Sequence, residues 1–141
     1  MLNRASIKIE AKLENVSMIR VMVASFLSRT NITLDELSDI KTAVSEAVTN
    51  AIVHGYPDRI GVITMRCRIL KDGVLDIVIK DKGVGIKDLA QARQPMFTTG
   101  GAERSGMGFT IMESFMTSIS VTSAPGKGTS VHMRRKLLRR K

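Results

Sequence analysis

Apolar residues recur at spacings of three and four between Thr33 and Gly55, which predicts one long helix with an apolar face. The apolar positions of this helix are Leu34, Leu37, Ile40, Val44, Ala47, Val48, Ala51 and Ile52. Thr33 followed by Glu36 has the form of a capping box, which favours a helix start at this point. Gly55, with Pro57 just beyond it, favours the end of the helix.

The same period predicts two shorter helices, at 16–27 with Asn15 as its N-cap and at 109–116. β-rich or alternating runs predict five strands, at 7–13, 62–70, 74–80, 119–121 and 129–133. Asp72-Gly73 between the second and third runs is a strong hairpin signal. Residues 88–94 favour a short helix and 95–105 a mobile loop. This order predicts an α/β fold, a two-layer sandwich whose mixed, mostly antiparallel sheet carries its helices on one face.

Length and charge predict one domain over 1–133 and a basic tail over 134–141. The net charge is +9, and the last eight residues carry six positive charges and no negative one, which leaves +3 for the rest. A solvated tail is the first interpretation, and contact with nucleic acid or a membrane surface is the alternative. Cys67 is the only cysteine, so no intrachain disulfide can form. With no signal peptide and no membrane-spanning apolar run, we expect a cytoplasmic protein without membrane contact.

Three polar residues recur along one flank of the long helix. Glu46, Asn50 and His54 are spaced four apart, so they stack along its surface. Glu46 and Asn50 border the apolar face, where a carboxylate and a carboxamide one turn apart can hold a hard cation and handle a proton. An ordinary solvated pair is the alternative for this spacing taken alone, and we expect His54 to have a structural partner.

Two glycine motifs follow in the second half of the chain. Asp81-x-Gly83-x-Gly85 comes directly after a strand, where an aspartate can accept a hydrogen bond from an exocyclic amine. Gly106-Met107-Gly108 precedes a helix, whose free N–H groups favour a phosphate. Arg104 can add a charge-assisted contact to that phosphate. Taken alone, the first motif is also found in ordinary turns, and a flexible loop is the alternative for the second. Position 88 is an aspartate where the Rossmann fingerprint needs its third glycine, which excludes that fingerprint. The P-loop is excluded because Gly126-Lys127 would need a glycine at 121, which is Val121, and a Ser or Thr at 128, which is Gly128.

The ordered set of these motifs resembles the Bergerat-type ATP-binding domain shared by gyrase, Hsp90, histidine kinases and MutL. Within that group, the segments 46–56, 92–99 and 103–113 resemble the anti-sigma F factors, which are serine-protein kinases. The resemblance covers nearly the whole chain except its tail.

The resemblance implies two ligands, ATP or ADP and Mg²⁺, and a role for each motif. Asn50 would bind the Mg²⁺, Glu46 would activate the attacking hydroxyl group, and Arg104 would lie near the γ-phosphate. A lid over the triphosphate would span 98–108 and include Thr98, Thr99, Gly106, Met107 and Gly108.

The resemblance assigns binding of the nucleotide base to the motif at the end of the strand. Asp81 would bind the adenine amine with support from Thr129. Gly83 and Gly85 would flank the ring, because a residue without Cβ lets the backbone approach a flat group closely.

The resemblance further implies partners. The protein would phosphorylate a serine of an anti-anti-sigma protein, inhibit a sporulation sigma factor and form a homodimer, with Arg20 facing a partner and no direct nucleic-acid contact. Two alternatives remain at this point: a nucleotide-gated binding switch without kinase activity, and a small basic protein that binds nucleic acid through residues 134–141.

Overall fold

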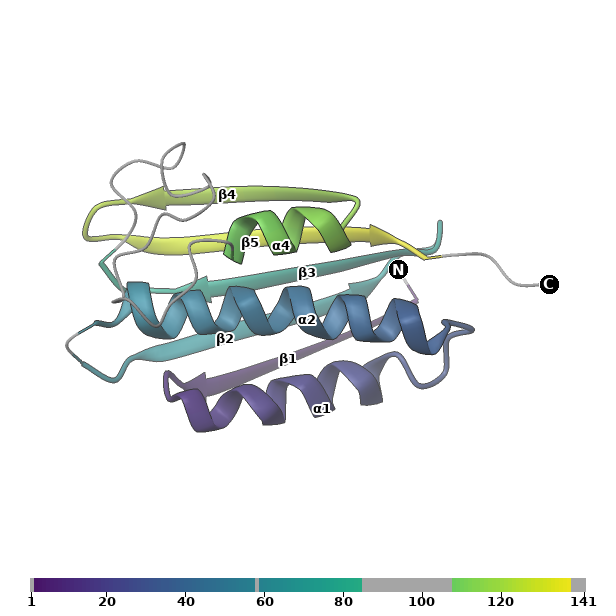
Figure 1. Ribbon diagram of the computed structural model, residues 1–141, viewed down its shortest axis with the longest axis horizontal. Coiled ribbons are helices and arrows are strands. Elements are labelled where there is room, and N and C mark those ends of the chain that lie inside the picture. Colours follow the sequence, from purple (N-terminus) through teal and green to yellow (C-terminus); the bar gives the residue numbers. More distant parts are fainter. Residues whose placement is uncertain (1, 58, 85–107, 138–141) are drawn as a thin grey trace.

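Five strands and three α-helices make up the computed structural model, which describes residues 2–57, 59–84 and 108–137. The elements are β1 (Asn3–Glu10), the 3₁₀ turn η1 (Leu13–Asn15), α1 (Val16–Phe26), α2 (Leu34–Asn50), the π-turn η2 (Ala51–Gly55), β2 (Val62–Ile69), β3 (Val74–Asp81), α4 (Gly108–Phe115), β4 (Ser118–Ala124) and β5 (Gly128–Lys136). The strands form one sheet in the order β1-β2-β3-β5-β4 (Figure 1). Every strand pair among the described residues is antiparallel, where the sequence predicted a mixed, mostly antiparallel sheet.

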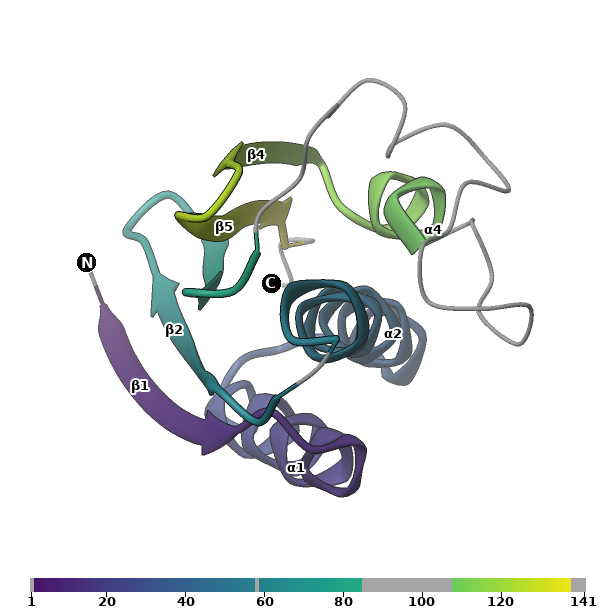
Figure 2. The ribbon, with the colours of Figure 1, turned by 90° about the vertical axis from the view of Figure 1, so that its left-hand side faces the viewer.

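All three α-helices lie on one face of the sheet (Figure 2), as the sequence predicted. The α/β two-layer sandwich is therefore confirmed. Its core is aliphatic and lies between the two layers, where the largest fully buried side chains include Ile19, Ile40, Ile63, Leu75, Ile77 and Met133. Cys67 also lies in this core, and burial together with the charge of Asp76 raises the pKa of its thiol to about 12. No described helix has the length and apolar character that crossing a membrane requires.

The predicted capping box starts α2. The Glu36 N–H donates to the Thr33 hydroxyl at 3.0 Å, and the Thr33 N–H donates to the Glu36 carboxylate at 3.1 Å. Asn15 is the N-cap residue of α1, as predicted, but its side chain makes no cap bond and instead donates to the carbonyl of Glu10 at 2.9 Å.

The basic tail begins later than the sequence indicated. Arg134, Arg135 and Lys136 belong to β5, so they are not part of a solvated tail. Arg135 is held on the helix side, where it donates to the carbonyl of Phe115 at 2.7 Å and to Asp39 at 3.3 Å. The division into one domain stays a prediction, and residues 138–141 and the short helix and loop expected at 88–105 lie outside the described residues.

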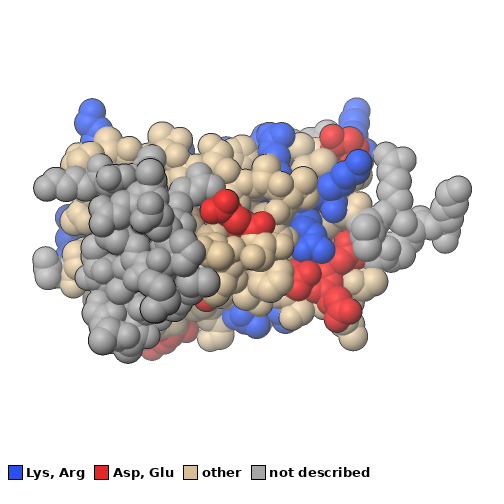
Figure 3. Space-filling model, turned by 45° about the horizontal axis from the view of Figure 1, so that its top comes forward, with Lys and Arg blue, Asp and Glu red and all other residues tan. Residues whose placement is uncertain are grey.

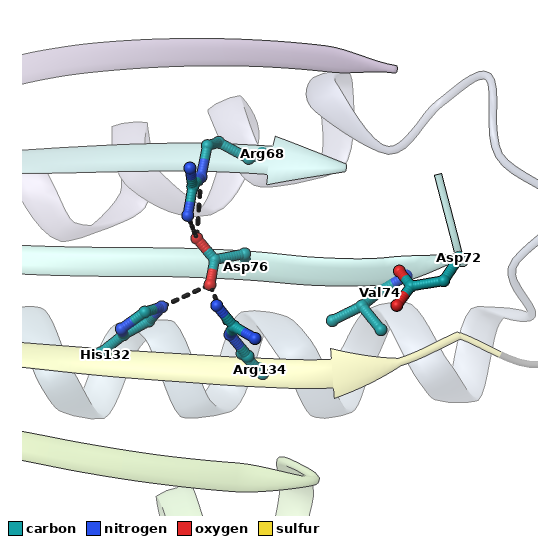
Figure 4. Close-up of polar contacts among 6 residues, drawn as sticks. All are labelled: Arg68, Asp72, Val74, Asp76, His132 and Arg134. Atoms are coloured by element: carbon teal, nitrogen blue, oxygen red, sulfur yellow. Dashed lines mark hydrogen bonds and ion pairs between the residues drawn. The ribbon is translucent and has the colours of Figure 1, made fainter. Parts of the chain in front are cut away.

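The opposite face of the sheet, which we call the outer face, holds one fully buried carboxylate. Asp76 has no exposed side-chain surface. Arg68 donates to it at 2.7 and 2.9 Å, Arg134 at 2.8 Å, and His132 also contacts it (Figure 4). Burial acts to raise the pKa of Asp76, but the hydrogen bonds from the imidazole and the two guanidinium groups outweigh it and hold the pKa below its ordinary value.

We expect Asp76 to stabilise the fold above its ordinary pKa of 3.8 and to lose this contribution as the pH falls through its lowered pKa. Asp76→Asn should therefore cost about 1–3 kcal/mol at pH 7 and flatten the acid limb of the stability profile. Urea unfolding between pH 3 and pH 7 measures both effects. Glu10→Gln is the control, since this acid lies on the same face with a side chain that is 65% exposed. Equal acid limbs in the parent and Asp76→Asn would contradict the assignment.

Candidate functional site

The end of β3 places a buried carboxylate beside the helical layer. Asp81 is the last residue of the strand and is 8% exposed. Its Oδ1 accepts the N–H of Gly83 at 2.9 Å, and Thr129 of β5 lies directly opposite in the strand register. Burial raises the pKa of Asp81, while hydrogen bonds from the backbone N–H groups of Gly83 and Thr129 oppose that rise only in part. A carboxyl group in this setting gains from a further hydrogen-bond donor.

The end of η2, which continues α2, is fastened by direct backbone contact to the residues that follow β3. The N–H of Val84 donates to the carbonyl of Gly55 at 2.8 Å. A Cβ on Gly83 would lie 1.9 Å from that carbonyl oxygen, and a Cβ on Gly55 would lie 3.1 Å from the Asp81 carboxylate. Only glycine fits at Gly83, so the approach of helix to strand depends on the absence of a side chain there.

β5 approaches the same point from the other side. Gly128 has a positive φ of +86°, and a Cβ there would lie 2.2 Å from the carbonyl oxygen of Asp81. The hydroxyl of the next residue, Thr129, lies 2.8 Å from that of Ser123. Three chain segments that are far apart in sequence therefore meet around Asp81.

The two candidate residues of α2 lie toward this end of the molecule. Asn50 is the last residue of α2, one π-turn before Gly55, and Glu46 is one turn earlier. Both are half-buried, at the border of the core as the sequence predicted. α4 begins at Gly108 and runs alongside α2, with its first residue toward the same end (Figures 1 and 2). The fold thus brings an acid, an amide, the strand-end aspartate and a helix N-terminus to one end of the sandwich.

Arg20 connects α1 to α2 close to this end. Its Nη1 donates to the Ser45 hydroxyl at 2.9 Å, and Ser45 precedes Glu46 in the chain. The side chain is half-buried, so its guanidinium is held in place next to α2. Its predicted role toward a partner stays a prediction.

Six of the predicted site residues fall outside the described part of the chain. They are Gly85, Thr98, Thr99, Arg104, Gly106 and Met107. His54 has an interaction, as expected for a helix-end histidine with a partner.

Sequence reasoning overlooked the contribution of Tyr56. This residue is 6% exposed, and its hydroxyl donates to the carbonyl of Val62 at 2.8 Å and accepts the N–H of Lys82 at 2.7 Å. It therefore joins the end of α2 to β2 and to the strand-end motif. The available signal was that the only tyrosine of the chain directly follows the helix-ending Gly55.

Comparison with known families agrees with this geometry. A model of the histidine kinase-like ATPase domain matches residues 9–135. Among solved structures, the RsbU and RsbW domains of a Mycobacterium tuberculosis protein align with a TM-score of 0.73 at 20% identity, over 98% of this chain and 33% of that one. The histidine kinase domain of a blue-light activated kinase from Erythrobacter litoralis aligns with a TM-score of 0.61 at 22% identity, over 89% of this chain and 60% of that one. These likenesses show the fold, an ATPase domain of the histidine kinase type.

Curated relatives identify the family within this class of ATPase domains. The anti-sigma F factor of Clostridium acetobutylicum is 50% identical over 135 residues, which cover 95% of this chain and 94% of the relative. That of Geobacillus kaustophilus is 48% identical over 143 residues, which cover 100% and 97%. The chain therefore belongs to the anti-sigma F factor family within the histidine kinase-like ATPases.

We expect Gly83→Ala to destabilise the protein by about 1–3 kcal/mol or more, because its methyl group would overlap the Gly55 carbonyl. The free energy of unfolding in urea measures this loss. Gly73→Ala is the matched control: Gly73 has a positive φ of +84°, but a Cβ there meets nothing within 4 Å. The control should lose only the conformational strain of about 1–2 kcal/mol. A Gly83→Ala protein as stable as the parent would show that the helix end and the strand end are not in contact.

Proposed function

We propose that this protein is an anti-sigma factor that binds Mg-ATP, phosphorylates a serine of an anti-anti-sigma protein and inhibits a sporulation sigma factor. The observation that carries the proposal is the buried Asp81 beside two glycines at the end of β3. The class of fold implies nucleotide binding, and the names of the relatives supply the sigma factor as partner.

The residues around Asp81 suit a purine base. A buried carboxylate with a raised pKa gains from an N–H donor, and the exocyclic amine of adenine is such a donor. Gly55 has no Cβ beside the Asp81 carboxylate and Gly83 has none beside the Gly55 carbonyl, so no side chain from these two positions crowds the acceptor that the base would contact. Thr129 supports the carboxylate from the neighbouring strand. Gly85 belongs to the same motif by sequence.

The residues of α2 suit the phosphate end of the ligand. The bound nucleotide supplies the phosphoryl group for transfer, and Mg²⁺ neutralises part of its charge. In the part of the chain that the structure describes, no three His, Cys, Asp or Glu side chains gather into a metal site. The side-chain oxygen of Asn50 would be the protein ligand of the ion, with phosphates and water as the others. Arg104 and the segment 98–108 would contact the phosphates.

Glu46 would act as the general base. It lies one turn from Asn50, so it can take the proton of a serine hydroxyl that attacks the terminal phosphate. Its half-buried position keeps it within reach of both the core of the site and an incoming partner. Arg20, held by Ser45 next to Glu46, would face that partner. A homodimer in the cytoplasm completes the proposal.

Asp81→Asn should weaken ATP binding by about tenfold to a hundredfold, because a charged acceptor for the adenine amine is replaced by a neutral amide. The same change should reduce the preference for ATP over GTP, since the amide N–H can donate to a guanine carbonyl. Isothermal titration with each nucleotide in Mg²⁺ measures both effects. Asp72→Asn, in the exposed β2–β3 turn, is the control. Absence of any heat on addition of Mg-ATP or Mg-ADP to the folded parent would remove the nucleotide from the proposal.

Glu46→Gln should slow phosphoryl transfer to the serine partner by about 10²–10⁴-fold while nucleotide affinity stays unchanged. Transfer from γ-labelled ATP to the copurified partner, measured in single turnover, gives the rate. Glu14→Gln, an exposed acid before α1, should transfer at the parental rate. Glu46 is not the base if its variant keeps that rate. If the parent forms a nucleotide-dependent complex and labels no serine, the protein is a nucleotide-gated switch instead of a kinase.

A further inference from the structure

The outer face of the sheet is strongly basic. The strand register places seven basic side chains on this face: Arg4, Lys8, Arg66, Arg68, Lys80, Arg134 and Lys136. Only two acids share it, Glu10 and Asp76. The described helices all cover the other face (Figure 2). By contrast, the view from the side of β4 and α4 shows acidic and basic side chains close to one another (Figure 3).

One end of the outer face is hollowed into a groove of about 880 Å³. The basic residues that line it are Lys8, Arg59, Lys80, Lys82 and Lys127, and hydroxyl groups of Thr64, Thr122 and Ser130 lie between them. Among the described residues, the only acid in the lining is Asp81, which the groove shares with the candidate nucleotide site and whose carboxylate accepts the N–H of Gly83. Positively charged side chains thus surround a concave surface, whose lining also includes the apolar residues Ile60, Val62 and Ala124, and this charge raises the local potential for an anion.

Farther along the same face, Asp76 fixes two guanidinium groups against the sheet. Arg68 and Arg134 both bond to this buried carboxylate, yet their side chains remain 30% and 47% exposed. These two side chains have therefore already lost conformational entropy on folding, so less entropy is lost when they contact a partner. A guanidinium group held in this way presents planar N–H donors that suit a carboxylate.

The geometry points to an acidic protein segment as the occupant, and we propose that the outer face and its groove bind one. No aromatic side chain occurs among the outward positions of the five strands, and Tyr56 in the lining of the groove is only 6% exposed, so an exposed ring on which bases could stack is missing from the described residues of this surface. Five strands at about 4.8 Å spacing span about 19 Å, too broad for a DNA major groove of about 12 Å. A second copy of the chain is a less suitable occupant, because a symmetric contact would bring the basic side chains of two identical faces together.

The test is binding of a fluorescein-labelled oligo-glutamate peptide to the full chain without nucleotide, followed by anisotropy. We expect saturable binding that weakens as salt rises. The double variant Arg66→Glu with Lys80→Glu should weaken it by about tenfold or more. The matched control, Arg29→Glu with Lys41→Glu, makes the same change in net charge on the helix side and should stay within about twofold of the parent. Thermal unfolding confirms that each variant is folded.

Three results would overturn the proposal. They are no binding of the peptide, equal weakening by the two double variants, and tighter binding of a DNA duplex than of the peptide under the same conditions. Because nucleotide is absent from the assay, failure of the ATP-dependent function leaves this result unaffected. Strong duplex binding that both double variants weaken equally would indicate attraction by net charge alone.

Discussion

The contact between the backbone at Gly83 and the carbonyl of Gly55 is the constraint on which the site depends. It fastens the end of the longest helix to the end of a central strand, with a hydrogen bond of 2.8 Å from Val84. Without this contact Asp81 would not be buried beside the helix, and the flank that carries Glu46 and Asn50 would not lie beside the strand end. Tyr56 strengthens the same junction through its two hydrogen bonds. A few backbone atoms thus position side chains that come from distant parts of the chain.

The sequence predicted helices and turns well where the interactions that stabilise them join residues close together in the chain. The capping box of α2 needs only Thr33 and Glu36, three residues apart, and both of its bonds are present. The β2–β3 hairpin follows from Asp72-Gly73, with Gly73 at a positive φ. In the site, Asp81 and Thr129 were assigned from the resemblance, and the register now places them opposite each other.

Other features depend on contacts between segments that are far apart in the chain, and local sequence patterns do not predict such contacts. Arg134 looked like part of a solvated basic tail because its partner, Asp76, is 58 residues away in the chain. The burial of Asp76 itself has no local signal, since an aspartate in a strand usually faces water. In each case tertiary contact, which no local period encodes, decided the outcome.

Direct pairing of β3 with β5 has a consequence for how relatives can diverge. Val84 is anchored by two backbone hydrogen bonds, to Gly55 and Gly126, and α4 is packed against α2. The polypeptide between these anchors joins two fixed points, so an insertion or deletion there leaves the sheet register untouched. Relatives can therefore differ in the length of this connection while the pairing of the strands stays the same.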